Sequence, residues 1–207
     1  MSKRDGLFVF IDAENMRKAV RECGYQKIDY RKLYKWLTET KGAKRVYLYA
    51  GYIEDDEAEK RKFESLEKLG YILRLKEVQK YPATEQPFQV TCENCKHVNH
   101  RVRKIEGRSK ANCDSELTLD VINQGSRGRY SEIIVFSGDG DFSKMYEYVS
   151  KDMKRKVLVF SPMQLWPARL RTSQKLRELD SDGCLSLQPL ETILPKFAAK
   201  NKTGLRR

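Results

Sequence analysis

Five short apolar runs, rich in β-branched and aromatic residues, recur along the chain and predict buried strands. They lie at residues 7–11, 45–50, 71–75, 133–136 and 156–160. Continuous apolar runs of this length are typical of strands in a parallel sheet that helices cover on both faces. Helix-like stretches separate most of them. The pattern therefore predicts an α/β fold with a mainly parallel five-stranded sheet and helices on both faces.

Local signals place the helices between these runs. Asp29 is a preferred N-cap residue and precedes a helix that we expect to run through Leu37. Gly70 closes another predicted helix, which begins near Asp55. The remaining predicted helices cover residues 15–24, 113–123 and 142–150.

Residues 79–112 interrupt the alternation of strands and helices. This stretch contains Pro82 and Pro87, both histidines, two cysteines and a basic run that ends at Lys110. Its composition predicts an insertion or large loop outside the core. We expect residues 1–195 to form a single domain that carries this insertion, followed by a basic, frayed C-terminal tail at residues 196–207.

Charge indicates the class of partner. The 207 residues include 41 Lys and Arg against 29 Asp and Glu, a net charge of +12. This excess favours an anionic partner, and nucleic acid is the first candidate. No run is long enough to span a membrane, and Asp12 and Glu14 follow the first apolar stretch too soon for a signal peptide. Five cysteines, an odd number, favour the reducing cytoplasm over a disulfide framework.

Carboxylates follow two of the predicted strands. Asp12 ends the first strand, and Asp139 and Asp141 come directly after the fourth. Because parallel strands end at one edge of a sheet, we expect these side chains to lie together there. Asp114, at the start of a predicted helix, is the first choice for a further member of the site, and Asp120 is the second. The alternative is that these residues only form turns and helix caps, with Asp141 capping the following helix.

Several carboxylates without intervening Lys or Arg repel one another unless some are protonated or a cation binds. Mg²⁺ or Mn²⁺ suits oxygen ligands better than zinc does. Such an ion lowers the pKa of bound water and stabilises phosphate charge in an in-line displacement. Together with the basic composition, the acidic residues predict hydrolysis of phosphodiester bonds.

Three segments carry a family resemblance. FIDAEN at 10–15, KANCDSELTLD at 110–120 and FSGDGDF at 136–142 resemble, in this order, the signature segments of the NYN domain, the LabA-like branch of the PIN-like nucleases. Residues 173–179 also resemble the family's segment after the fifth strand. The resemblance runs over most of the chain and implies a three-layer, PIN-like (Rossmannoid) fold and metal-dependent ribonuclease activity.

The resemblance also implies roles for individual residues. Four aspartates match the acidic positions that hold the metal or orient water: Asp12, Asp114, Asp139 and Asp141. Asn15 matches the polar residue of the first motif, which orients the first aspartate or touches substrate. The chain departs from the family pattern at Ala13, Glu14, Cys113 and Ser115.

A CxxC pair, Cys92 and Cys95, has the spacing of half a zinc site. Tetrahedral zinc needs two more ligands, and the preferred pair is His100 with Cys113, with His97 also within reach in sequence. The alternative is a pair of free thiols in a loop. A zinc ion here would be structural and would not be the catalytic ion.

Basic residues gather in and after the interrupted stretch. A single basic run is more often a solvated face, but their sum predicts contacts with the RNA backbone. Tyr81, Phe88 and Trp166 are candidate stacking surfaces for single-stranded RNA. The candidate RNA-binding residues are Arg101, Arg103, Lys104, Arg108, Lys110, Arg169 and Arg171.

The leading prediction is thus a Mg²⁺- or Mn²⁺-dependent ribonuclease that acts on single-stranded RNA. The alternative is an inactive RNA-binding or scaffold module on the same fold. A phosphatase of the haloacid dehalogenase type is disfavoured, because Glu14 stands where its second aspartate would lie. A homodimer is plausible for such a fold.

Overall fold

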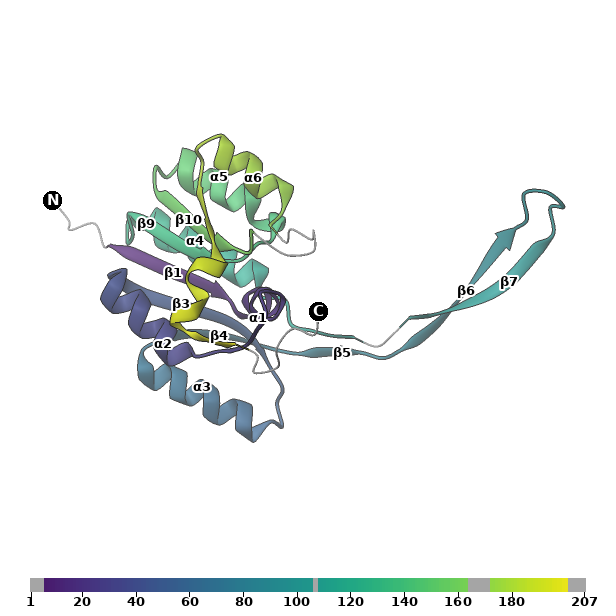
Figure 1. Ribbon diagram of the computed structural model, residues 1–207, viewed down its shortest axis with the longest axis horizontal. Coiled ribbons are helices and arrows are strands. Elements are labelled where there is room, and N and C mark those ends of the chain that lie inside the picture. The colour runs from purple at the N-terminus through teal and green to yellow at the C-terminus, as the bar shows by residue number, and fades with distance from the viewer. Residues whose placement is uncertain (1–5, 106–107, 164–171, 201–207) are drawn as a thin grey trace.

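The computed structural model describes residues 6–105, 108–163 and 172–200. Its centre is a six-stranded sheet in which every neighbouring pair is parallel (Figure 1). In spatial order the strands are β11 (Ser186–Pro189), β10 (Lys156–Ser161), β9 (Glu132–Phe136), β1 (Leu7–Asp12), β3 (Ala43–Tyr52) and β4 (Ile72–Glu77). This arrangement confirms the predicted α/β fold. The predicted number of five strands is wrong, because β11 is short and half polar and so carries no apolar run.

Helices cover both faces of the sheet, as predicted. One layer contains α1 (Ala13–Glu22), α2 (Tyr30–Lys35) with the π-helical turn Trp36–Thr40, and α3 (Glu57–Leu69); the other contains α4 (Asp114–Ser126), α5 (Ser143–Lys151) and α6 (Gln174–Ser181). Short 3₁₀ turns lie at Gly140–Phe142, Leu190–Thr192 and Leu194–Lys196. In the parts of the chain that the structure describes, no helix is long and apolar enough to cross a membrane.

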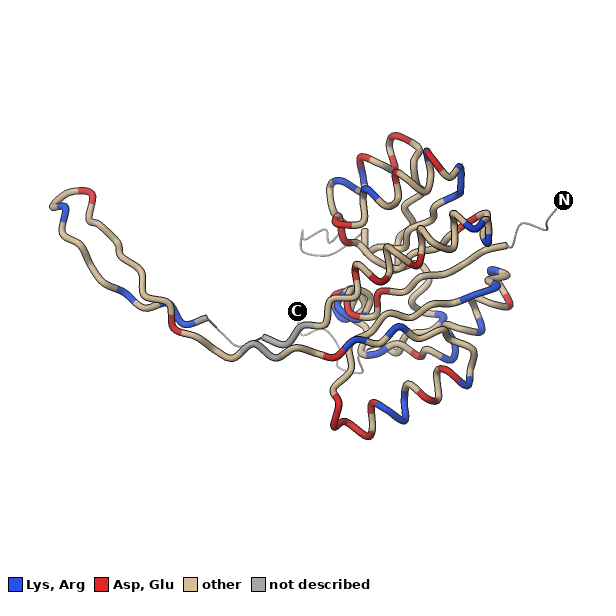
Figure 2. Tube along the Cα trace, turned by 180° about the vertical axis from the view of Figure 1, so that it is seen from behind, with Lys and Arg blue, Asp and Glu red and all other residues tan. Residues whose placement is uncertain are grey.

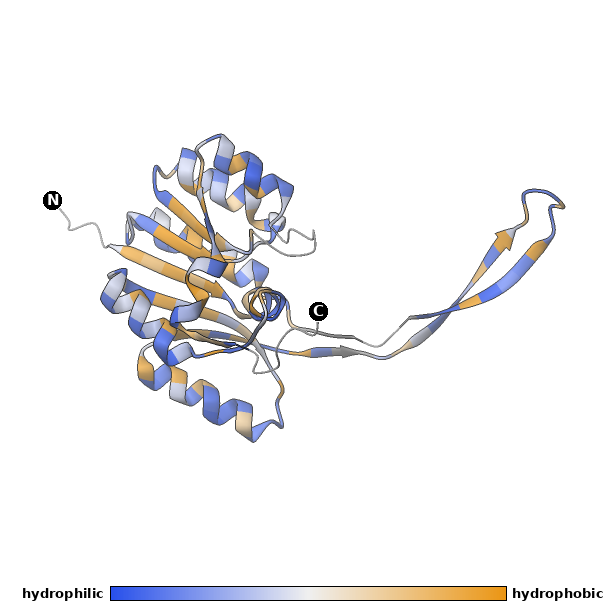
Figure 3. Cartoon of the chain, in the orientation of Figure 1, coloured by the Kyte–Doolittle hydropathy of each residue, from blue (hydrophilic) through white to orange (hydrophobic). Residues whose placement is uncertain are grey.

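Strand β1 shows how one apolar run fills both layers. Its side chains alternate between the faces of the sheet. Val9 and Ile11 belong to the core under α1, α2 and α3, whereas Phe8 and Phe10 belong to the core under α4, α5 and α6. All four are at most 1% exposed. Figure 3 shows the resulting apolar sheet between two amphipathic layers.

The predicted tail does not begin at residue 196. Phe197 is buried and packs on Trp36, with ring centroids 6.0 Å apart. Strand β12 (Ala198–Lys200) then pairs antiparallel with β2 (Tyr25–Ile28). The basic composition concealed this strand, because only Ala198 of its three residues packs against the core, next to the buried Phe197. Residues 201–207 lie outside the described residues.

Residues 79–110 form two-stranded ribbons that project from the sheet, here called the arm. It comprises β5 (Gln79–Tyr81) paired with β8 (Arg108–Lys110), and β6 (Thr84–Thr91) paired with β7 (Val98–Ile105). Figures 1 and 2 show the arm extending well away from the two helical layers. Every residue of β6 is exposed. The stretch that was predicted to lie outside the core does so.

Candidate active site

Asp12 stands at the carboxyl end of central strand β1, where the chain turns into α1. Its Oδ1 accepts a hydrogen bond of 3.0 Å from the backbone N–H of Asn15, so Asp12 is the N-cap of α1. The cap fixes the carboxylate at the edge of the sheet and leaves it only partly exposed. The predicted location of Asp12 at this edge is confirmed.

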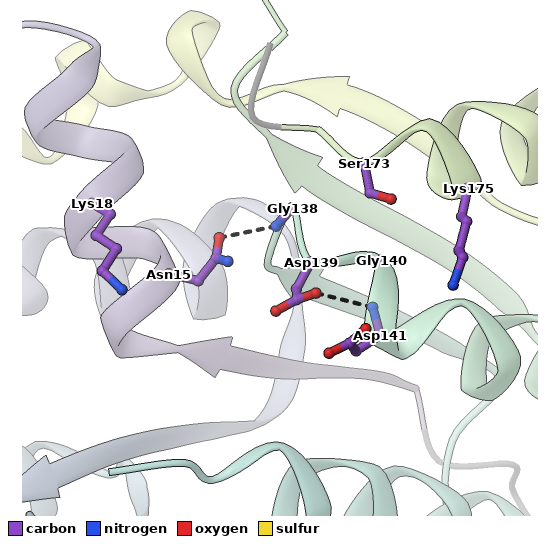
Figure 4. A pocket seen from close by; sticks show the side chains of 8 residues that line it. All are labelled: Asn15, Lys18, Gly138, Asp139, Gly140, Asp141, Ser173 and Lys175. Carbon is purple, nitrogen blue, oxygen red and sulfur yellow. Dashed lines mark hydrogen bonds between the residues drawn. The ribbon is translucent and has the colours of Figure 1, made fainter. Parts of the chain in front are cut away.

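The loop after β9 is fastened to the same point. Asn15 Oδ1 accepts from the backbone N–H of Gly138 at 3.0 Å (Figure 4), and the hydroxyl of Ser137 donates to Asp12 Oδ2 at 3.4 Å. The N–H of Asp139 donates to Ser137 Oγ at 3.3 Å. Sequence reasoning missed Ser137, although its position directly after a buried strand was a usable signal. Together these bonds hold the carboxyl end of β1 and the loop after β9 against each other.

Asp139 and Asp141 have different surroundings. Asp139 Oδ1 accepts from the N–H of Asp141 at 2.9 Å and so caps the 3₁₀ turn (Figure 4). The alternative in which Asp141 caps the following helix is therefore wrong. Asp141 lies within this turn and is exposed, while Asp139 is half-buried and lines the same cleft as Asp12.

Electrostatics connect three of the predicted aspartates. The pKa of the Asp12 carboxyl is raised from 3.8 to about 6, mainly by burial and also by the negative charges of Asp114 and Asp139, while backbone hydrogen bonds from Asn15 and Glu14 partly oppose this rise. Desolvation and like charge both disfavour an ionised carboxylate. Asp114, the first residue of α4, is thus brought to the site as predicted. Such a cluster favours a bound cation.

Two hollows adjoin these carboxylates. The larger, of about 550 Å³, is a cleft lined by residues that include Asp12, Asn15, Asp114 and Asp139. The smaller, of about 360 Å³, lies beyond Asp139. Figure 4 shows its lining, which is Asn15, Lys18, Gly138, Asp139, Gly140, Asp141, Ser173 and Lys175.

The smaller hollow adds cations to the site. Lys18 comes from α1 and Lys175 from α6, and both are exposed. Ser173 precedes α6, and its N–H donates to Gly138 O at 3.1 Å. The sequence pointed to neither Lys18 nor Ser173 as a site residue, and it indicated Lys175 only as one of many basic residues that together could contact RNA, within the segment 173–179 that resembles the family. A negatively charged ligand group in this hollow would meet two ammonium groups beside the carboxylates.

Asp120 is not part of this site. Its Oδ2 accepts from Tyr49 Oη at 2.9 Å and from Arg74 Nε at 2.8 Å. Asp120 lies six residues beyond Asp114, and a helix turns by about 240° beyond one full turn over that distance. The prediction of Asp120 as a catalytic residue is therefore wrong: it joins α4 to β3 and β4.

We expect Asp120→Ala to destabilise the protein without affecting chemistry in the cleft. The change leaves the buried Tyr49 hydroxyl and Arg74 without their acceptor. A lost partner of this kind costs about 1–3 kcal/mol. Urea unfolding of Asp120→Ala, Tyr49→Phe and the double variant measures the coupling between the two side chains. Additive losses would show that the hydrogen bond contributes nothing.

The four predicted zinc ligands are not brought together. Cys92 and Cys95 flank the turn at the far end of the arm, and His100 pairs with Gln89 within the ribbon. Cys113 lies at the base of α4, where its thiol faces Ala50 O at 3.8 Å and burial raises its pKa to about 11. The predicted set fails because the β6–β7 ribbon is extended and separates its two ends.

The predicted RNA-binding residues fall into two groups. Arg101, Arg103 and Lys104 lie on β7 of the arm, and Arg108 and Lys110 lie on β8. Arg169, Arg171 and the candidate stacking residue Trp166 lie outside the described residues.

The residues of the cleft fit a hard divalent cation in the chemistry of their donors. They offer carboxylate oxygens, and the pKa of Asp12 is raised first by burial and then by the charges of Asp114 and Asp139. Within the described residues, however, no three His, Cys, Asp or Glu side chains lie close enough to form a metal site by themselves. Mg²⁺ commonly takes only one or two protein carboxylates and completes its shell with water and phosphate oxygens.

Fold and site together define an α/β protein of the PIN-like class, with its acidic cleft at the carboxyl ends of parallel strands. The family model of the NYN domain matches residues 6–181, and the chain belongs to this family. The NYN domain is a member of the PIN-like nuclease superfamily, so the resemblance seen in the three motifs is confirmed.

Two known proteins are similar to this chain. The low amplitude and bright protein LabA of Synechococcus elongatus is 28% identical over 143 residues, which cover 68% of this chain and 66% of LabA. The chain thus matches just under two thirds of that protein's length. A crystal structure of a Vibrio parahaemolyticus protein of unknown function shares the fold, with a TM-score of 0.63 at 22% identity over 96% of this chain and 98% of the other.

Proposed function

We propose that this protein is a Mg²⁺- or Mn²⁺-dependent ribonuclease that hydrolyses phosphodiester bonds of single-stranded RNA in the acidic cleft. The observation that carries the proposal is the cleft at the carboxyl end of β1, which Asp12, Asp114 and Asp139 line together and in which burial raises the pKa of Asp12. Strongly perturbed carboxylates in a cleft are typical of functional sites.

In this proposal Asp12, Asp114, Asp139 and Asp141 hold the metal. When bound, Mg²⁺ or Mn²⁺ supplies a bound water of lowered pKa and stabilises negative charge on phosphate. Asn15 and Ser137 orient the carboxylates through the hydrogen bonds described above. Lys18 and Lys175 bind RNA phosphates on the far side of Asp139.

The arm supports single-stranded RNA as the substrate. Directly paired residues of an antiparallel ribbon share a face, so Phe88 and Arg101 lie on the same face as Gln86 and Arg103. The guanidinium of Arg103 lies 5.7 Å from the centre of the Phe88 ring, and Phe88 is 39% exposed. An exposed aromatic ring among arginines can stack a base and bind its phosphates.

One observation favours the alternative, an inactive RNA-binding or scaffold module. In the described part of the chain, no three His, Cys, Asp or Glu side chains are arranged so that they could hold a metal ion together. In that case the cleft would bind RNA without cleaving it. The two functions differ in whether cleavage depends on the carboxylates.

The proposal is tested by incubating a labelled single-stranded RNA with the pure protein and Mn²⁺ or Mg²⁺. We expect cleavage that a chelator abolishes and that Asp139→Asn lowers at least 100-fold, because one metal-binding charge is lost while an amide oxygen can still cap the 3₁₀ turn. Asp152→Asn, an exposed change after α5, is the charge-matched control. Binding without cleavage, or equal cleavage by all variants, would contradict the proposal.

The cysteines support the cytoplasm as the place of action. None of the five, all of which lie in the described part of the chain, is joined in a disulfide. Free thiols persist in a reducing compartment.

A further inference from the structure

The turn at the far end of the arm holds two cysteines in a closed loop. The N–H of Lys96 donates to Cys92 O, and the N–H of Cys92 donates to His97 O, both at 2.9 Å. These bonds fold residues 92–97 into one compact turn between β6 and β7. Cys92 and Cys95 thereby lie three residues apart within one closed loop.

The backbone of this turn includes one residue in an energetically unfavourable conformation. Lys96 has a φ of 58°, one of two positive values among the non-glycine residues that the structure describes. Such a conformation is unfavourable for a residue with a Cβ atom and points to a function. It bends the chain back at the residue after Cys95 and so closes the turn around both cysteines. Cysteine binds zinc as the thiolate.

The turn provides two ligands where tetrahedral zinc needs four. In the chain as far as it is described, no third His, Cys, Asp or Glu joins them. Cys113, the nearest cysteine in sequence after the arm, lies at its base against Ala50. A second copy of the chain offers the remaining ligands, because a two-fold axis through the metal would supply an identical Cys92 and Cys95 pair.

The arm is built for a contact between two tips. It carries the turn away from the helical layers, so two copies can meet there without a clash between their sheets (Figure 1). A two-stranded ribbon is only marginally stable alone, and a metal at its end would fix it. A site of four thiolates and one Zn²⁺ has a net charge of −2, and this negative charge offsets the repulsion between the two basic arms. Residues 84–104 include two acidic residues, Glu85 and Glu93, and four basic ones, Lys96, Arg101, Arg103 and Lys104.

We propose that two copies of this chain are joined tip to tip by one zinc ion that is bound by Cys92 and Cys95 of each copy. The site differs from the sequence-based set, since neither His100 nor Cys113 takes part. It is independent of the chemistry in the cleft. In such a dimer the two arms would lie end to end, and each arm would expose its face with Phe88, Arg101 and Arg103.

The test measures metal content and mass on the same sample. The full chain is purified under reducing conditions, loaded with Zn²⁺, and analysed by elemental analysis and analytical ultracentrifugation. We expect half a zinc ion per chain and a dimer that a strong chelator converts to monomer. Titration with Co²⁺ should saturate at half an ion per chain and give the visible spectrum of a tetrahedral tetrathiolate site.

The variant Cys92→Ser/Cys95→Ser should be monomeric and free of zinc, with unchanged thermal unfolding of the sheet because the turn lies outside both cores. Cys23→Ser is the matched control: burial raises the pKa of Cys23 to about 12, so this thiol is a poor ligand, and the variant should still dimerise. One zinc per monomer would overturn the proposal. So would a zinc-free monomer, a dimer that survives in the double variant, or a dimer that reductant alone dissociates. RNA cleavage is scored separately and has no part in this outcome.

Discussion

Asp12→Asn is expected to abolish metal-dependent RNA cleavage and, at neutral pH, to make the protein more stable. The aspartate is held in a partly buried position among like charges, which raises its pKa to about 6. Asparagine keeps the side-chain oxygen that caps α1 and removes the charge. The function proposed here therefore requires a carboxylate that the fold itself disfavours.

The gain in stability should depend on pH with a definite sign. The Asp12 pKa is 3.8 when unfolded and about 6 when folded, so the folded state holds the proton more tightly. Wild-type stability is thus lost as pH rises from about 4 to 6 and the carboxylate forms, at a cost on the order of 3 kcal/mol. Asp12→Asn does not lose this stability, because asparagine does not ionise. The difference in free energy of unfolding between variant and wild type should be small at pH 4 and largest above pH 7.

Urea unfolding at pH 4 and pH 7.5 measures this difference, with Asp152→Asn as a control whose exposed charge should give no such change. An advantage of the variant that is equal at both pH values would contradict the assignment to Asp12. Mn²⁺ provides a second measurement. It should raise the melting temperature of the wild type, because a bound cation relieves the carboxylate repulsion, and it should do so much less for Asp12→Asn.

Gly140→Ala should damage both stability and activity through one contact. A Cβ atom at this position would lie 2.2 Å from Ser173 Oγ and 2.8 Å from Ser173 Cβ. The turn that carries Asp139 and Asp141 would have to move away from the start of α6. Overpacking of this kind costs about 1–3 kcal/mol, and a displacement of about 1 Å at a catalytic group can cost about 100-fold in rate.

The companion change Ser173→Gly removes both clashing atoms. We expect the double variant Gly140→Ala/Ser173→Gly to recover most of the stability that Gly140→Ala loses. Gly140 does not need a positive φ, and a glycine-to-alanine change at an unstrained position stabilises a protein by about 0.4–1 kcal/mol through the unfolded chain. Thermal unfolding and RNA cleavage of the four proteins in this cycle are the measurements. Equal losses with and without Ser173 would show that another contact is responsible.

The sequence predicted those features that follow from local pattern. The apolar runs identified five of the six sheet strands, and the rule that parallel strands end at one edge brought Asp12 and Asp139 together. Asp114 reached the same place because it is the first residue of its helix. Each of these predictions needed only a strand, its direction and the residue that follows it.

The remaining features depend on contacts between distant segments. Lys175 and Ser173 reach the cleft only because α6 packs beside the turn after β9. Asp120 belongs to the same helix as Asp114, yet the pitch of that helix turns it toward Arg74. Strand β11 has no apolar run, and its pairing with β10 is what defines it. No local pattern contains this information.

The pairing of β12 with β2 affects when the fold can form during synthesis. Phe197 O accepts from the N–H of Asp29 at 2.7 Å, and the Phe197 ring completes the core that α1 and Trp36 share. The layer that holds Asp12 at its cap is therefore incomplete while residues 197–200 remain inside the ribosome. A nascent chain would expose this apolar layer until translation has passed these residues, so assembly of the cleft follows the synthesis of residues 197–200.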